Sequence, residues 1–336
     1  MIKIALAAAY LVLSGATLQA GGLDDLKAAN AAVEKGNGDE AIRLFSQALA
    51  AGDLSPGATA TARKSRGTEY TTKSLIADAF QRRDDARRLR DSAIADFTAA
   101  LDFQGDDAGL HINRAQVQHL NGAYDQAIMD FDAALKLNNA PLTLIQRAAS
   151  RRAAGKYDGA FADYSAALAA DIKDSGIDAW DILSERGTNE FIAARYDTAA
   201  ADFEKALMLG VTAHTGDVLW LPYQAAWLHI ARARAGQNDS TELARNAEKI
   251  DLKMWPGTLI AFYLGQATAE QLSPPSNHGA MGHGRECNLS FFTGELALTK
   301  GDSMEAVRQF QRARQVCNIH TVHYLAAGVE LKRLKK

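Results

Sequence analysis

The sequence of 336 residues has little cysteine, little proline and no long apolar run. Two cysteines are too few for a disulfide-dense small fold, a four-cysteine zinc site or a cysteine-ligated iron–sulfur cluster. No apolar stretch reaches the roughly 18–20 residues that a membrane-spanning helix requires. The net charge of −3 also lacks the basic excess that phosphate binding needs, so we do not expect nucleic acid as a partner.

The composition that remains is that of a folded, helical protein. Hydrophobic residues make up 47% of the chain and charged residues 23%, which excludes disorder over the whole length. Alanine is abundant, and alanine has the highest intrinsic helix propensity. We therefore expect an all-α protein.

The N-terminus has the pattern of a secretory signal peptide. Lys3 supplies the positive charge, residues 5–18 are mostly apolar, and Ala20 offers a small residue for cleavage. The alternative is an N-terminal helix of the fold itself, although this segment is apolar on every face. We predict that residues 1–20 are removed near Ala20 and that the mature chain is periplasmic or secreted.

A short phrase recurs along the mature chain: an alanine, an aromatic four residues later, and a second alanine three residues after that. The aromatics at 97, 131 and 164 follow one another at intervals of 34 and 33 residues. Spacings of three and four place all three side chains on one helix face. The phrase occurs at Ala41-Phe45-Ala48, Ala93-Phe97-Ala100, Ala127-Phe131-Ala134, Ala160-Tyr164-Ala167, Ala199-Phe203-Ala206 and Ala306-Phe310-Ala313.

Each phrase predicts the second helix of a helical hairpin. Another small residue usually stands twelve positions before the first alanine, as at Ala115, Ala148 and Gly187. Small residues let two helices approach closely while the aromatic fills the space between them. All six prolines fall outside the helix interiors that this register predicts, where proline would cost about 3 kcal/mol each.

These residues resemble the tetratricopeptide repeat (TPR), a unit of two antiparallel helices. With the signal peptide at 1–20, the resemblance implies a TPR solenoid at 21–210, with one unit lengthened at about 67–93, and a last unit with a capping helix at 287–336. Between them the sequence predicts an irregular helical segment at 211–272 and a Pro/Gly/His loop at 273–286. The first helix of each TPR unit lines a concave groove. The positions carried over to this groove are Ile112, Gln116, His119, Ile145, Ala149, Arg152, Ser184, Thr188 and Phe191.

A second pattern accompanies the phrase in the central units. An arginine precedes the small residue of the first helix, and an aspartate precedes the aromatic of the second. We interpret this as a ladder of structural ion pairs, since a partly buried arginine is satisfied by a carboxylate fork. The alternative, an acid–base or anion site, would need a lone perturbed carboxylate. The arginines are Arg66, Arg114, Arg147 and Arg186, and the aspartates are Asp96, Asp130, Asp163 and Asp202.

The C-terminal third is similar to the end segment of a bacterial secreted TPR family. The likeness runs from Trp255-Pro256 through Phe291-Phe292 and Tyr324 to Leu334. That family includes an outer-membrane lipoprotein that holds murein hydrolases and proteases together. The anchor cysteine of its lipoprotein members is missing here, so the resemblance implies no membrane attachment.

Cys287 and Cys317 each lie 15 residues from Asp302, which stands in the turn of the last hairpin. Equal distance from the turn means equal height in antiparallel helices. We therefore predict a disulfide in an oxidising compartment, the alternative being two buried free thiols.

Four of the eight histidines lie near the C-terminus: His278, His283, His320 and His323. They could bind zinc or copper, but His278 and His283 are not at helical ligand spacing. The alternative function is therefore a metal-binding protein or enzyme built around residues 278–283.

The leading hypothesis is a non-catalytic periplasmic scaffold that binds other proteins or peptides in its concave groove and acts in envelope or murein metabolism. The Gly-x-Ser-x-Gly, His-Glu-x-x-His and P-loop motifs are absent, and no cofactor is expected. The sequence leaves the oligomeric state open, including a homo-oligomer.

Overall fold

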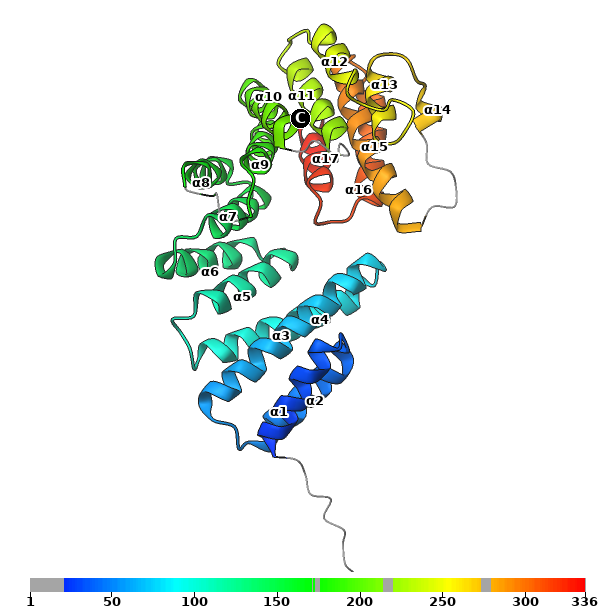
Figure 1. Cartoon of the computed structure of the whole chain (residues 1–336). Coiled ribbons are helices and arrows are strands. Elements are labelled where there is room, and N and C mark those ends of the chain that lie inside the picture. Colours follow the sequence, from blue (N-terminus) through cyan, green and yellow to red (C-terminus); the bar gives the residue numbers. More distant parts are fainter. Residues whose placement is uncertain (1–20, 171, 173–175, 214–219, 273–278, 336) are drawn as a thin grey trace, which may run out of the picture.

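The computed structural model describes residues 21–170, 172, 176–213, 220–272 and 279–335. Every regular element in these ranges is a helix, and consecutive helices stack into a curved solenoid (Figure 1). The predicted all-α TPR solenoid is confirmed. Among the described residues, none of the helices has the length and apolar character needed to cross a membrane.

The N-terminal helices form five consecutive antiparallel hairpins. Their bounds are α1 Gly22–Glu34, α2 Gly38–Ala51, α3 Pro56–Ala79, α4 Arg83–Leu101, α5 Ala108–Leu120, α6 Tyr124–Leu137, α7 Pro141–Ala153, α8 Tyr157–Ala169, α9 Ala179–Ile192 and α10 Tyr196–Ala213. The C-terminal helices are α11 Leu221–Arg234, α12 Ser240–Ala247, α13 Gly257–Tyr263, α14 Ala269–Leu272, α15 Gly279–Thr299, α16 Ser303–Val316 and α17 Val322–Arg333.

The recurring aromatic is the centre of each hairpin. Phe45, Phe97, Phe131 and Tyr164 are fully buried, and each lies in a separate small cluster with alanines from its own hairpin. The core is therefore divided into units along the N-terminal half. This is the arrangement expected of a solenoid, in which each repeat contacts its neighbours.

The C-terminal half has one continuous core instead. Phe191, Phe203 and Trp227 pack together with Phe291 and Phe310, so α9, α10, α11, α15 and α16 share a single apolar cluster. Trp227 lies at its centre, with ring centroids 5.2–5.6 Å from those of Phe191, Phe203, Phe291 and Phe292. α17 closes the cluster through Ala326 and Ala327.

Prolines start helices in this fold, as the register predicts. Pro56, Pro141 and Pro222 occupy the first or second position of α3, α7 and α11. The missing N–H costs nothing there, because the first turn leaves its amides unpaired.

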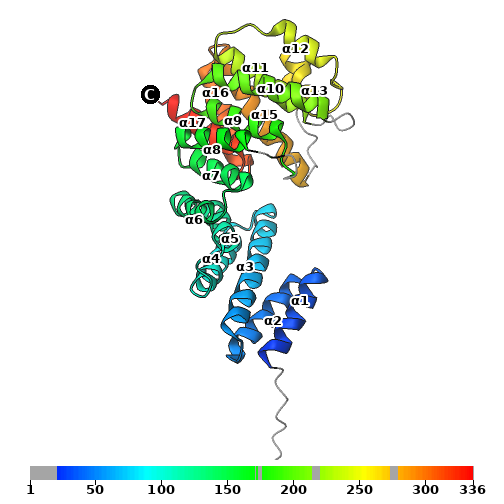
Figure 2. The same ribbon diagram turned by 60° about the vertical axis from the view of Figure 1, so that its left-hand side comes forward.

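The second hairpin is much longer than its neighbours. α3 has 24 residues and α4 has 19, whereas α5 to α8 have 13 or 14 each. Its far end extends past α1–α2 and towards the C-terminal helices (Figures 1 and 2).

The loop that we predict at 273–286 is wrong in its second half. α15 begins at Gly279, so residues 279–286 are helical. Tertiary contacts account for this: Arg285 lies 4.8 Å from the Trp255 ring and donates hydrogen bonds to the Leu272 carbonyl at 2.9 and 3.2 Å. These contacts offset the helix penalty of glycine, about 1 kcal/mol per residue.

The glycines opposite the aromatics predict a test of the hairpin packing. A Cβ at Gly294 would lie 2.7 Å from the Phe310 ring, whereas a Cβ at Gly284 in the same helix would meet nothing within 4 Å. We expect Gly294→Ala to lower the free energy of unfolding by about 1–2 kcal/mol, because overpacking outweighs the gain in helix propensity. Gly284→Ala should raise it by up to about 1 kcal/mol. Urea denaturation of both variants measures the difference, and equal effects would contradict the close packing.

Candidate functional site

The predicted arginines and aspartates form four bidentate ion pairs, one in each hairpin from α3–α4 to α9–α10. In each pair the arginine Nε and Nη2 donate to the two carboxylate oxygens, at 2.6–2.9 Å. The aspartate side chains are only 4–7% exposed. The pairs are Arg66–Asp96, Arg114–Asp130, Arg147–Asp163 and Arg186–Asp202.

Each arginine also reaches back to the preceding hairpin, a contact that the sequence analysis missed. Its Nη1 donates to the residue that directly follows the preceding aromatic, at 2.6–3.1 Å. The ladder therefore joins neighbouring units as well as the two helices within a unit. The sequence signal for this contact is a serine, threonine or aspartate directly after each aromatic. The acceptors are Ser46, Thr98, Asp132 and Ser165.

The carboxylate partners keep these arginines charged. The side-chain hydrogen bond to aspartate raises the pKa of Arg66, Arg114 and Arg186 above its ordinary value. Charge-assisted bidentate pairs of this kind fix orientation as well as supplying energy. The arrangement is that of a repeated scaffold link.

The ladder predicts unequal costs for two aspartate substitutions. Asp163 accepts hydrogen bonds from both Arg147 and Arg151, so Asp163→Asn should lower the free energy of unfolding by about 2–3 kcal/mol. Asp125→Asn is the control, because Asp125 is 73% exposed in its pair with Lys156 and should change stability by at most about 0.5 kcal/mol. Urea denaturation measures both, and similar costs would show that the ladder is not structural.

The inner face of the solenoid is formed by the first helix of each hairpin. α5, α7 and α9 lie on the inside of the curve, while α6, α8 and α10 lie outside (Figure 1). Side chains that remain partly exposed on this face are Ile112, Gln116, Ile145, Ala149 and Ser184. They combine apolar surface with one amide and one hydroxyl group.

Leu142 belongs to the same face and was not among the predicted positions. It is 52% exposed on α7 and precedes Ile145 and Ala149 by three and seven residues, which places the three side chains on one side of the helix. The open part of the inner face therefore contains an exposed leucine.

Three of the predicted groove residues do not line an open surface. Phe191 is 1% exposed because Tyr196 and Trp227 pack edge-on against its ring. Thr188 is buried, and its hydroxyl donates to the Ser184 carbonyl at 2.8 Å. Arg152 is also buried and forms an ion pair with Glu185 at 2.7 Å. For these three positions the prediction of an open groove is wrong, because later parts of the chain and neighbouring side chains cover them.

His119 marks the edge of the open face. Its Nδ1 lies 2.9 Å from the Ser150 hydroxyl, and its ring meets Tyr124 edge-on at 5.3 Å. Burial, with the nearby His320 and Arg152, lowers the pKa of His119 to about 4. The imidazole is therefore neutral at pH 7.

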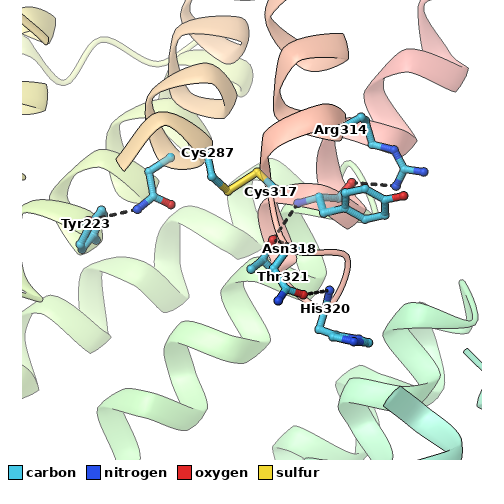
Figure 3. Close-up of a disulfide and its surroundings, with 9 residues drawn as sticks. Tyr223, Cys287, Arg314, Cys317, Asn318, His320 and Thr321 are labelled. Atoms are coloured by element: carbon cyan, nitrogen blue, oxygen red, sulfur yellow. Dashed lines mark hydrogen bonds between the residues drawn. A yellow bond between two sulfur atoms is a disulfide. The ribbon is translucent and has the colours of Figure 1, made fainter. Parts of the chain in front are cut away.

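The predicted disulfide is present between Cys287 of α15 and Cys317 at the end of α16, with an S–S distance of 2.10 Å (Figure 3). Both cysteines are almost completely buried. A bond that closes a loop of 30 residues contributes about 3–4 kcal/mol on the chain-entropy model.

The structure separates the two histidines of the last hairpin region. His320 contacts Asp78 through Nε2 at 3.2 Å, whereas the His323 ring packs against Trp227, Phe291 and Phe292. Burial lowers the pKa of His323 to about 4. His278 and the side chain of His283 lie outside the described residues. Within the described ranges, no three His, Cys, Asp or Glu side chains gather as a metal site would require.

A buried charged cluster ties α17 to the rest of the C-terminal half. Arg234 of α11 pairs with Glu295 at 2.5 Å and with Glu330 at 3.3 Å, and its guanidinium lies 4.7 Å from the Tyr196 ring centroid. Arg333 contacts Glu330 and the Ile192 carbonyl. Burial, together with the neighbouring Glu330, raises the pKa of Glu295 to about 8.

This cluster predicts how stability depends on pH. Between about pH 4.5 and pH 8 the folded protein keeps a proton on Glu295 that the unfolded chain has lost, so rising pH lowers the free energy of unfolding. Glu295→Gln should remove this contribution, and its stability relative to the parent chain should rise across that window. Urea denaturation at several pH values measures the slope.

Glu305→Gln is the matched control, because hydrogen bonds to Gln309 and Arg308 lower the pKa of Glu305 below its usual value. Its titration therefore lies below the window. A parent chain whose stability does not change between pH 5 and pH 8 would contradict the assignment to Glu295.

The paired helices, the buried aromatics and the inner face together define a TPR-type helical solenoid. A tetratricopeptide repeat protein from Parabacteroides merdae ATCC 43184 has the same fold, with a TM-score of 0.54 and 16% identity, over 94% of this chain and 99% of that one. The C-terminal part of a TPR repeat-containing protein from Cytophaga hutchinsonii has a TM-score of 0.50 and 13% identity, over 87% of this chain and 95% of that one.

A curated protein is also similar to the chain in sequence. The chain is 27% identical over 169 residues to a protein of Haemophilus influenzae named as a homologue of the lipoprotein NlpI. The match covers 48% of this chain and 50% of the relative, so the chain spans about half the length of the relative that it matches. No family model matches the chain.

Proposed function

We propose that this protein is a non-catalytic adaptor that binds a segment of another protein along its inner face. The observation that carries the proposal is the partly exposed stripe of Ile112, Gln116, Leu142, Ile145 and Ala149 across α5 and α7. Apolar side chains with an interspersed amide suit an extended or helical segment of a protein. The ion-pair ladder beneath this face holds the helices in fixed positions, which reduces the entropy lost on binding.

We further propose that the protein acts in the cell envelope, in a periplasmic or secreted location and in murein metabolism. Three observations support the envelope location: the signal-peptide pattern of residues 1–20, the Cys287–Cys317 disulfide, and the similarity to a protein named as a lipoprotein homologue. The murein link rests on the resemblance of the C-terminal third to the secreted TPR family described above. Disulfides form and persist mainly in oxidising compartments.

Capture experiments with charged substitutions test the inner face. We expect Leu142→Glu and Gln116→Arg in the immobilised mature chain to reduce capture of its envelope partner about tenfold or more, since a charge would be buried against an apolar contact. Quantitative mass spectrometry of the captured proteins measures the loss.

Met129→Glu serves as the control, because Met129 is 71% exposed and belongs to α6, a helix that lies on the outside of the curve (Figure 1). Circular dichroism should show unchanged helicity in all three variants. Partner capture that survives both inner-face substitutions, or that is lost equally in Met129→Glu, would rule out binding at this face. Partners that are murein-processing enzymes or proteases would support the proposed pathway, and partners from another process would exclude it.

A further inference from the structure

The long α3–α4 hairpin touches the far end of the chain. Asp78, near the end of α3, lies 3.2 Å from the Nε2 atom of His320, which follows it by 242 residues. His320 belongs to the short connection between α16 and α17. This hydrogen bond joins the α3–α4 hairpin to the C-terminal helices. It closes the curve of the solenoid on itself.

Asp78 is well placed to hold this contact. Its carboxylate is 8% exposed and also accepts a hydrogen bond from Arg90 of α4 at 2.6 Å. Arg90 in turn donates to the Asn121 side chain in the turn after α5, at 3.1 Å. Arg90 thus holds the carboxylate that receives His320, and Asn121 holds Arg90 in turn.

The segment that presents His320 is fixed as well. The His320 backbone N–H donates to the Asn318 side chain at 2.9 Å, and the Thr321 hydroxyl accepts from the Tyr324 N–H at the start of α17 (Figure 3). Cys317, which directly precedes Asn318, forms a disulfide with Cys287 of α15. The disulfide therefore anchors one end of the segment, and α17 anchors the other.

The hairpin end and the C-terminal helices enclose a cavity beside this contact. The cavity has a volume of about 260 Å³, with Asp78, Gln81 and Arg83 on the hairpin side. Cys287 and Cys317 are part of the opposite wall. The His320–Asp78 hydrogen bond and the walls of this cavity are the place where the end of the α3–α4 hairpin meets the C-terminal helices.

We propose that the Cys287–Cys317 disulfide and the His320–Asp78 contact together form a redox-sensitive latch that holds the solenoid closed. Cys287 and Cys317 line the cavity, so a reducing thiol would approach the disulfide from this side. A dithiol reductant attacks one sulfur as its thiolate and forms a mixed disulfide, and the other cysteine leaves as a thiolate. The second thiol of the reductant then displaces the first cysteine, so the reductant is oxidised to a disulfide and both cysteines are reduced.

Reduction releases the anchor at Cys317, so the segment that carries His320 loses its fixed position and the hairpin end separates from it. This device is a property of the free protein. The latch does not depend on whether the inner face binds a partner.

Hydrogen exchange and small-angle X-ray scattering on the full mature chain test the latch. We expect His320→Ala to speed amide exchange at the end of α3 about fivefold, as for the loss of one hydrogen bond, and to increase the radius of gyration. Treatment of the parent chain with dithiothreitol should do the same. Dithiothreitol should add no further change at the α3 end in His320→Ala, because both changes open the same contact.

His111→Ala is the matched control. His111 also pairs with an aspartate, Asp130 at 3.0 Å, but within a single hairpin, so exchange at the α3 end should not change. An unchanged α3 end and radius in His320→Ala would overturn the closure. A response to His320→Ala but not to dithiothreitol, or an equal response to dithiothreitol in parent and variant, would overturn the redox link.

Discussion

The solenoid depends on the hydrogen bonds that one arginine makes in each of four consecutive hairpins. Each of the four ladder arginines binds the aspartate of its own hairpin with two hydrogen bonds and the preceding hairpin with a third. One side chain thus sets both the packing within a unit and the orientation of that unit relative to the one before. Because the aspartates are buried, a misplaced unit would leave a desolvated charge without its partner, and this cost favours a single register.

Apolar packing changes character along the chain, and this change divides the molecule. The first four hairpins each enclose one aromatic, so their apolar cores are separate. The angle between neighbouring hairpins sets the curvature of this part of the solenoid. From α9 onwards Trp227 and the phenylalanines around it merge the units into one core. α17 completes that core through the charged cluster at Arg234. The C-terminal half is therefore packed around a single core, and the end of the α3–α4 hairpin contacts this half through Asp78.

Most of the fold could be predicted because its signals are local. An aromatic with alanines at spacings of three and four specifies a helix face, and the small residue twelve positions earlier specifies the partner helix. The disulfide could be predicted for the same reason, since equal distances from one turn determine which cysteines meet. The start of α15 was missed, because Arg285 gains its helical conformation from Trp255 and Leu272, which lie elsewhere in the sequence.

The sequence alone determined the helical hairpins, the residues of the ion-pair ladder and the cysteine pairing, since each depends on spacing within one or two units. Only the tertiary structure decided which first-helix positions stay open. Phe191 and Leu142 occupy inner helices alike, but Trp227 covers the phenylalanine while the leucine remains exposed. The same holds for the closure between Asp78 and His320. The curvature accumulated over all intervening units brings these two residues together. A local sequence pattern does not specify this accumulated curvature.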